Sequence, residues 1–126
     1  MTTIWLVDDD DVVVQTIACI LEAYHYKVER FHSGQLFIDA FNNQTRPDLI
    51  IMDIMMHPPP DGNEVIRYLS HFEHPPVLAI TGNIEMIAGD VLTLLAGIIP
   101  KPCTMHDLKT IIEIALHGMR SPLHAN

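Results

Sequence analysis

The chain has 126 residues, of which 48% are hydrophobic, and a formal net charge of −9 at pH 7. This length and composition predict one folded domain with a hydrophobic core. The acidic charge argues against direct binding to nucleic acid, which needs a basic surface, and against binding to an anionic membrane. Asp8–Asp11 interrupt the N-terminal apolar stretch, so we expect no signal peptide, and no apolar run reaches the length of a membrane span. The two cysteines, Cys19 and Cys103, have no metal-type spacing, which predicts a reduced, cytoplasmic protein.

Short apolar runs alternate with longer amphipathic runs along the first half of the chain. Residues 4–7 predict a strand, and residues 12–24 predict a helix because their apolar positions recur at helical spacing. Residues 27–31 form a weaker strand signal, and Ser33 is expected to cap a short helix with one apolar face. Residues 48–52 are apolar after the first position, which is typical of a parallel strand buried on both faces.

The second half of the chain continues the same alternation. Asp61 and Glu64 resemble a capping box at the start of a helix, and Thr104 is expected to cap a last helix that ends at Gly118. The remaining predicted elements are a strand over 77–80, a helix over 85–96 and a short strand within 97–100. The whole pattern is (βα)5, which predicts an α/β fold with a parallel sheet covered by helices on both faces.

Polar residues of distinct types follow the ends of four predicted strands. Asp8 and Asp9 follow the first strand, and Asp53 follows the third. Thr81 and Lys101 follow the fourth and fifth strands. In a parallel α/β sheet, ligands bind outside the carboxyl ends of the strands, so we expect these five side chains to share one site.

This set of side chains predicts phosphoryl-transfer chemistry. Clustered carboxylates repel one another and require a cation, and Mg²⁺ prefers oxygen ligands, so Asp8 and Asp9 are expected to hold Mg²⁺. Asp53 is then a nucleophile that can attack phosphorus. Thr81 can donate a hydrogen bond to one phosphoryl oxygen, and Lys101 can place a positive charge beside another.

The chain resembles the response-regulator receiver domain over roughly residues 3–118. The matching segments are LVDDD at 6–10, PDLIIMDIMM at 47–56, DG at 61–62, ITG at 80–82 and KP at 101–102. No segment is specific alone, but their order and spacing together are. The resemblance implies a doubly wound, flavodoxin-like sheet with strand order 2-1-3-4-5. It divides the chain into a receiver domain over 1–119 and a C-terminal tail over 120–126.

The resemblance also implies a role for each site residue. Asp53 is the expected phosphoacceptor, and Thr81 and Lys101 are expected to bind the phosphoryl group. The expected Mg²⁺ ligands are Asp8, Asp9, Asp53 and the backbone carbonyl of Met55. The Lys101–Pro102 peptide bond is expected to be cis.

The expected partner is a sensor histidine kinase or a histidine phosphotransfer protein that carries a phosphohistidine. The protein would assist only its own phosphorylation and dephosphorylation, rather than act as an enzyme on other substrates. A homodimer through the face of the fourth helix, fifth strand and fifth helix is a further possibility that the resemblance raises. The chain is expected to be either a stand-alone receiver or a part of a longer protein.

Three positions depart from the family pattern. The segment His57–Pro60 is one residue longer than usual and contains three prolines, which stiffen it. Ile98 stands where the family often has an aromatic residue that changes orientation on activation. Gly82 follows the threonine at a position where alanine is common.

Two alternatives stay open at this point. The first is a receiver-like module that acts through protein contacts without phosphorylation; the presence of all five site residues weighs against it, and the altered proline segment keeps it open. The second is an enzyme of flavodoxin-like topology that binds a flavin or hydrolyses a phosphate ester. The second is disfavoured because acids, rather than a phosphate-binding glycine loop, follow the first strand.

Overall fold

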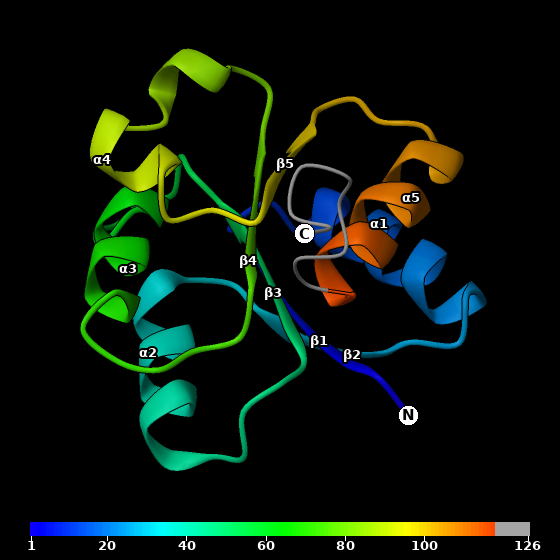
Figure 1. Cartoon of the computed structure of the whole chain (residues 1–126), viewed down its shortest axis with the longest axis horizontal. Coiled ribbons are helices and arrows are strands. Elements are labelled where there is room, and N and C mark those ends of the chain that lie inside the picture. Colours follow the sequence, from blue (N-terminus) through cyan, green and yellow to red (C-terminus); the bar gives the residue numbers. More distant parts are fainter. Residues whose placement is uncertain (118–126) are drawn as a thin grey trace, which may run out of the picture.

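The computed structural model describes residues 1–117 as a parallel five-stranded sheet between two layers of helices (Figure 1). The strand order is β2-β1-β3-β4-β5, which confirms the predicted flavodoxin-like fold. The strands are β1 (Thr3–Val7), β2 (Lys27–Phe31), β3 (Leu49–Asp53), β4 (Val77–Thr81) and β5 (Gly97–Pro100). The helices are α1 (Asp11–Ala23), α2 (Gly34–Asn43), α3 (Gly62–Leu69), α4 (Gly89–Leu92) and α5 (Met105–Leu116), with one 3₁₀ helix, η1 (Ile84–Met86). The predicted helix end at Gly118 and the predicted tail over 120–126 lie outside the described residues.

Each face of the sheet has its own hydrophobic core. Helices α1 and α5 cover one face, and α2, α3 and α4 cover the other (Figure 1). Alternate residues of β1 belong to different cores: Ile4 and Leu6 pack toward α1 and α5, whereas Trp5 and Val7 pack on the opposite face. This alternation explains why the strands are apolar at nearly every position. None of the helices within residues 1–117 has the length and apolar character needed to cross a bilayer.

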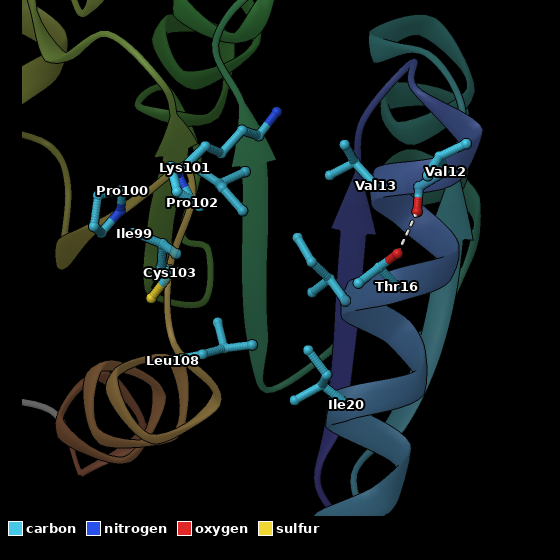
Figure 2. A pocket seen from close by; sticks show the side chains of 12 residues that line it. Val12, Val13, Thr16, Ile20, Ile99, Pro100, Lys101, Pro102, Cys103 and Leu108 are labelled. Carbon is cyan, nitrogen blue, oxygen red and sulfur yellow. Dashed lines mark hydrogen bonds between the residues drawn. The ribbon is translucent and has the colours of Figure 1, made fainter.

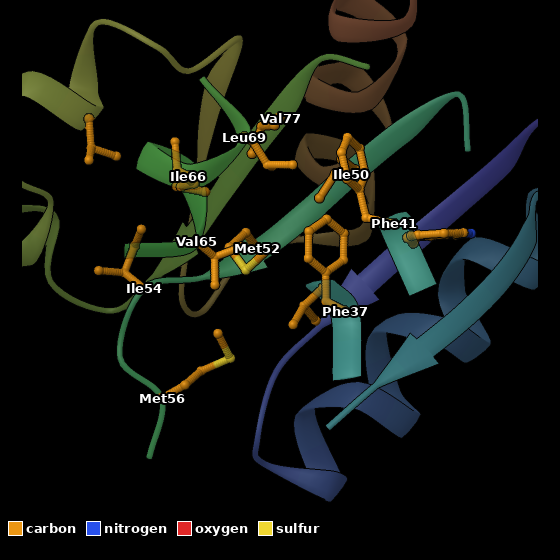
Figure 3. Packing of buried hydrophobic residues seen from close by; sticks show 14 of the residues in the cluster. Phe37, Phe41, Ile50, Met52, Ile54, Met56, Val65, Ile66, Leu69 and Val77 are labelled. Carbon is orange, nitrogen blue, oxygen red and sulfur yellow. The ribbon is translucent and has the colours of Figure 1, made fainter. Parts of the chain in front are cut away.

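The core beneath α2 and α3 is rich in large side chains. Figure 3 shows Phe37 and Phe41 of α2 close to Ile50 and Met52 of β3. The ring of Trp5 meets that of Phe37 edge-on at 5.9 Å between centroids, and each of these two side chains is fully buried. Such contacts fix α2 over the sheet, whereas the parallel backbone pairing of β1 with β3 places side by side the two strands that lead to the acidic residues.

Side-chain caps place the helix starts close to the strand ends. The Asp10 carboxylate accepts hydrogen bonds from the backbone of Val12 and Val13 at the start of α1. At α3, Asp61 and Glu64 form the predicted capping box, and Thr104 caps α5 as predicted. The links from β1 to α1 and from β5 to α5 are short, whereas the loop from β3 to α3 is longer and runs beside the acidic residues.

The predicted helix over 85–96 is present but much shorter than expected. The structure has only η1 and the four-residue α4 in this region. The Asn63 side chain donates to the backbone oxygen of Met86 and accepts from the backbone nitrogen of Ala88. These are the backbone groups that a continuous helix would pair internally, so a tertiary contact interrupts it.

Candidate functional site

The sheet register brings the predicted site residues to one edge. Val7 of β1 pairs with Met52 of β3, so the next residues, Asp8 and Asp53, lie in neighbouring positions. On the other side of β3, Thr81 of β4 pairs with Pro100 of β5, and Lys101 follows directly. Sequence position relative to each strand end therefore fixes which side chains meet.

The Lys101 ammonium group bridges two carboxylates. Its Nζ lies 2.9 Å from Asp8 Oδ2 and 3.3 Å from Asp53 Oδ1. Asp8 is completely buried and Asp53 is only 5% exposed, so both carboxylates depend on these contacts for charge compensation. The other oxygen of Asp8 accepts a hydrogen bond from the Asp10 backbone at 2.9 Å. The Lys101–Pro102 peptide bond is cis, as the resemblance implied.

The site holds more negative than positive charge. The pKa of the Asp53 carboxyl is raised to about 7, first by burial and then by the negative charge of Asp8, while Lys101 opposes the rise. Burial lowers the pKa of Lys101, but its hydrogen bond to Asp8 and the two nearby carboxylates raise it more, so the net shift is upward. The site therefore favours a bound proton or an additional cation.

Three carboxylates at the site could together hold a cation. One oxygen from each of Asp8, Asp9 and Asp53 lies within 4.8 Å of the others. Oxygen donors of this type fit a hard divalent cation such as Mg²⁺. Within residues 1–117, no other group of three or more acidic, histidine or cysteine side chains comes together in this way.

Thr81 lies at the site but turns its hydroxyl toward its own loop. The hydroxyl donates to the backbone oxygen of Asn83 and accepts from the backbone nitrogen of Asn83, both at 3.0 Å. The Asn83 side chain in turn caps η1 by accepting from the backbone of Glu85. The Thr81 hydroxyl is thus connected through Asn83 to the start of η1.

The segment after β3 forms another wall of the site. Met55 lines the same pocket as Asp8, Asp53, Thr81 and Lys101, and this open pocket has a volume of about 370 Å³. Two residues further on, the His57 backbone donates a hydrogen bond to Asp9 Oδ2 at 3.0 Å. The sequence pattern assigns neither His57 nor Asn83 to the site, because both act in part through backbone groups that carry no residue-type signal.

A separate apolar groove lies between α1 and α5 and ends beside Lys101 (Figure 2). Its volume is about 450 Å³. The α1 side presents Val13 and Ile20, and the opposite side presents Cys103 and Leu108. Because Lys101 lines both hollows, the apolar groove is continuous with the rim of the acidic site.

The fold and the acidic edge together define a receiver-like α/β class of protein. The sequence model of the response regulator receiver domain matches residues 4–113. The chain therefore belongs to the response regulator receiver domain family. This family consists of signalling domains of two-component systems rather than, in general, of enzymes.

Two curated relatives support this assignment. Transcription factor SKN7 of Candida albicans is 34% identical over 113 residues, which are 86% of this chain and 20% of that protein. Response regulator MprA of Mycobacterium avium is 35% identical over 109 residues, which are 83% of this chain and 46% of that protein. The chain thus spans less than half the length of these relatives.

Solved structures show the same architecture. The N-terminal domain of a response regulator/sensory box/GGDEF 3-domain protein from Carboxydothermus hydrogenoformans superposes with a TM-score of 0.86 at 30% identity, and the match covers 92% of this chain and 94% of that chain. A CheY-like receiver domain from Methylobacillus flagellatus gives a TM-score of 0.81 at 17% identity, covering 91% and 98%. The second likeness shows the shared fold alone.

Proposed function

We propose that this protein is a phosphorylation-dependent signalling receiver that accepts a phosphoryl group on Asp53 in a Mg²⁺-dependent reaction. The proposed donor is a phosphohistidine on a sensor histidine kinase or a histidine phosphotransfer protein. The observation that carries the proposal is the arrangement around Lys101, whose Nζ lies 3.3 Å from Asp53 and 2.9 Å from Asp8. A nucleophile and a positive charge thus stand side by side at the edge of the sheet where ligands bind.

In the proposed reaction, a carboxylate oxygen of Asp53 attacks the phosphorus of the donor. The phosphorus–nitrogen bond breaks, its electron pair stays on the imidazole, and Asp53 becomes an acyl phosphate. Asp53 must be ionised to attack, and its pKa of about 7 leaves both protonation states accessible near neutral pH. The protein promotes this reaction, and the later hydrolysis, only on itself.

The proposed Mg²⁺ ligands are Asp8, Asp9, Asp53 and the Met55 carbonyl. Mg²⁺, when bound, supplies the positive charge that neutralises the clustered acids and the phosphoryl oxygens. Support comes from the excess of negative charge at the site and from the short separation of the three carboxylates.

Lys101 and Thr81 are the proposed phosphoryl-binding side chains. Both can contact phosphoryl oxygens, Lys101 as a charge and Thr81 as a hydroxyl donor. Thr81 must first release the Asn83 backbone, and Asn83 caps η1. Phosphorylation would therefore alter η1 and α4 through the loop. Ile98 has no polar tip and packs against the core, so this route needs no rotating aromatic ring.

The phosphodonor protein is proposed to cover the groove between α1 and α5. Its phosphohistidine must reach Asp53, so its surface has to pack around the rim of the acidic site. The groove begins at Lys101, and Val12 beside it is strongly exposed. An apolar helix face on the donor protein would fill the groove as the histidine approaches.

Two finer proposals concern the oligomeric state and the cellular location of the protein. A homodimer through α4, β5 and α5 would cover the exposed side chains of Leu92, Leu94 and Met105. Light scattering with and without beryllofluoride, a phosphoryl mimic, tests this dimer.

A cytoplasmic location is proposed because both Cys19 and Cys103 are free thiols.

Incubation with acetyl phosphate and Mg²⁺, followed by intact-mass spectrometry, tests the proposed function. We expect the mass of one phosphoryl group on the wild type, and none on Asp53→Asn or in the presence of EDTA. Asp39→Asn, on the exposed surface of α2, is the matched control and should be labelled like the wild type. A wild type that stays unlabelled would favour the phosphorylation-independent interaction module.

A further inference from the structure

The loop between β3 and α3 is tied to the acidic site by one long-range hydrogen bond. The His57 backbone nitrogen donates to Asp9 Oδ2 at 3.0 Å, across 48 residues of sequence. Residues 58–60 are all proline and have no amide hydrogen. His57 is therefore the only residue of the 57–60 segment whose backbone can make such a bond.

Asp9 needs this support more than the other acids do. Asp8 and Asp53 are buried, and Lys101 holds both of them. Asp9 is exposed, and among the described residues the His57 amide is its only hydrogen-bond donor. Without that donor, the Asp9 side chain would be free to adopt other rotamers in solvent.

The loop that presents this amide is fixed independently of Asp9. Pro60 packs against the start of α2, where a Cβ on Gly34 would lie 2.6 Å from the Pro60 backbone oxygen. The Gly62 backbone N–H donates a hydrogen bond to the Ile54 backbone oxygen at 2.9 Å, and this bond closes the loop against the end of β3. A group held at both ends of its loop can orient a flexible side chain.

We propose that the backbone amide of His57 is a positioning group that orients Asp9 for Mg²⁺ binding. The hydrogen bond occupies Oδ2 and keeps the carboxylate beside Asp8 and Asp53, where it adds a ligand oxygen. Hydrogen bonds to metal-ligating carboxylates typically change metal affinity by about 10- to 100-fold. This inference rests on the Mg²⁺ site of the proposed function, and it makes the proline loop a part of that site.

Mg²⁺ titrations of two variants at the same position test the proposal. His57→Pro removes the amide hydrogen, and we expect it to weaken Mg²⁺ binding about 10-fold. His57→Ala removes the imidazole but keeps the amide, and we expect an affinity within about twofold of the wild type, because the proposal gives the imidazole no role. Equal Mg²⁺ affinities of the two variants would overturn the proposal, whereas a wild type that does not bind Mg²⁺ would instead overturn the proposed function.

A second measurement needs neither metal nor a proline substitution. In metal-free protein, Asp9→Ala should speed hydrogen exchange of the His57 amide by about 10-fold or more, because its acceptor is lost. The Gly62 amide, which bonds to Ile54, is the internal control and should exchange at an unchanged rate. A His57 amide whose exchange is indifferent to Asp9→Ala would show that the hydrogen bond does not persist in solution, and would overturn the proposal.

Discussion

At the scale of single residues, the site is defined by one lysine shared between two buried acids. The sequence predicted which acids, threonine and lysine would meet, because each stands at a strand end. It could not predict that Lys101 contacts Asp8 more closely than Asp53, or that His57 bonds to Asp9. Those contacts depend on loop paths and rotamers, which strand-end patterns do not specify.

Asp53→Asn should stabilise the metal-free protein at pH 8. The folded pKa of Asp53 is raised from its ordinary 3.8 to about 7, so its contribution to stability is fully present below pH 4 and is lost as the pH rises through 7. The neutral amide avoids this loss, which would be about 4 kcal/mol for the pKa shift alone, but it also gives up the ion pair with Lys101, so we expect a free energy of unfolding higher by about 1–2 kcal/mol at pH 8. Urea unfolding in EDTA at pH 4 and pH 8 measures the change.

The unfolding measurements on Asp53→Asn need a control substitution on the surface. Glu73→Gln removes an exposed carboxylate that precedes the amino end of β4, at the opposite end of that strand from Thr81, so its effect should be small at either pH. An Asp53→Asn protein no more stable than the wild type at pH 8 would show that Asp53 carries no unfavourable charge when folded.

Lys101→Met should strengthen Mg²⁺ binding while it destabilises the metal-free protein. The ammonium group competes with any added cation for Asp8 and Asp53, and its loss leaves both acids without a positive partner. Thermal unfolding with and without Mg²⁺ should show a larger metal-dependent stabilisation than in the wild type. Lys27→Met on the edge strand β2 is the control. If Mg²⁺ stabilised Lys101→Met no more than it stabilises Lys27→Met, this account would be contradicted.

At the scale of elements, caps and strand ends account for most of what the sequence predicted. Ser33, Asp61 and Thr104 each cap a helix as expected, because local side-chain chemistry decides these positions. The helix predicted over 85–96 begins later and is shorter, because the distant Asn63 side chain binds the backbone groups of Met86 and Ala88. Asp53 also proved to be the last residue of β3 rather than the first of a loop, which fixes its backbone within the sheet.

The start of α3 should be sensitive to a single methyl group. A Cβ on Gly62 would overlap the backbone oxygen of Asp53 and crowd Ile54. Gly62→Ala should therefore lower the free energy of unfolding by about 1–3 kcal/mol and slow phosphorylation, because it displaces the strand end that carries Asp53. Urea unfolding and the rate of labelling by acetyl phosphate measure the two effects.

Gly89→Ala is the matched control for this substitution. Nothing lies within 4 Å of a Cβ at Gly89, which is the first residue of α4. Alanine there should leave phosphorylation unchanged. It should stabilise the protein by about 0.5 kcal/mol, because it lowers the conformational entropy of the unfolded chain. Equal destabilisation by the two substitutions would mean that the packing of Gly62 on Asp53 is unimportant.

At the scale of the whole molecule, the site and the α4 region are linked by one short loop. Thr81 ends β4, and Asn83 caps η1 two residues later. With beryllofluoride and Mg²⁺, we expect hydrogen exchange to change over residues 83–92, because Thr81 leaves the Asn83 backbone to contact the phosphoryl mimic. The far ends of α2 and α3 should not respond. Changes confined to the acidic pocket would remove this route and favour a phosphate-relay role.

Chemical trapping of the phosphorylated residue tests the central claim most directly. Borohydride reduces an acyl phosphate on aspartate to the alcohol of homoserine, and peptide mass spectrometry then locates the changed residue. After treatment with acetyl phosphate and Mg²⁺, we predict homoserine at position 53 and unchanged aspartate at positions 8 and 9. Homoserine at either of those positions, or none at position 53, would contradict the assignment of Asp53 as the phosphoacceptor.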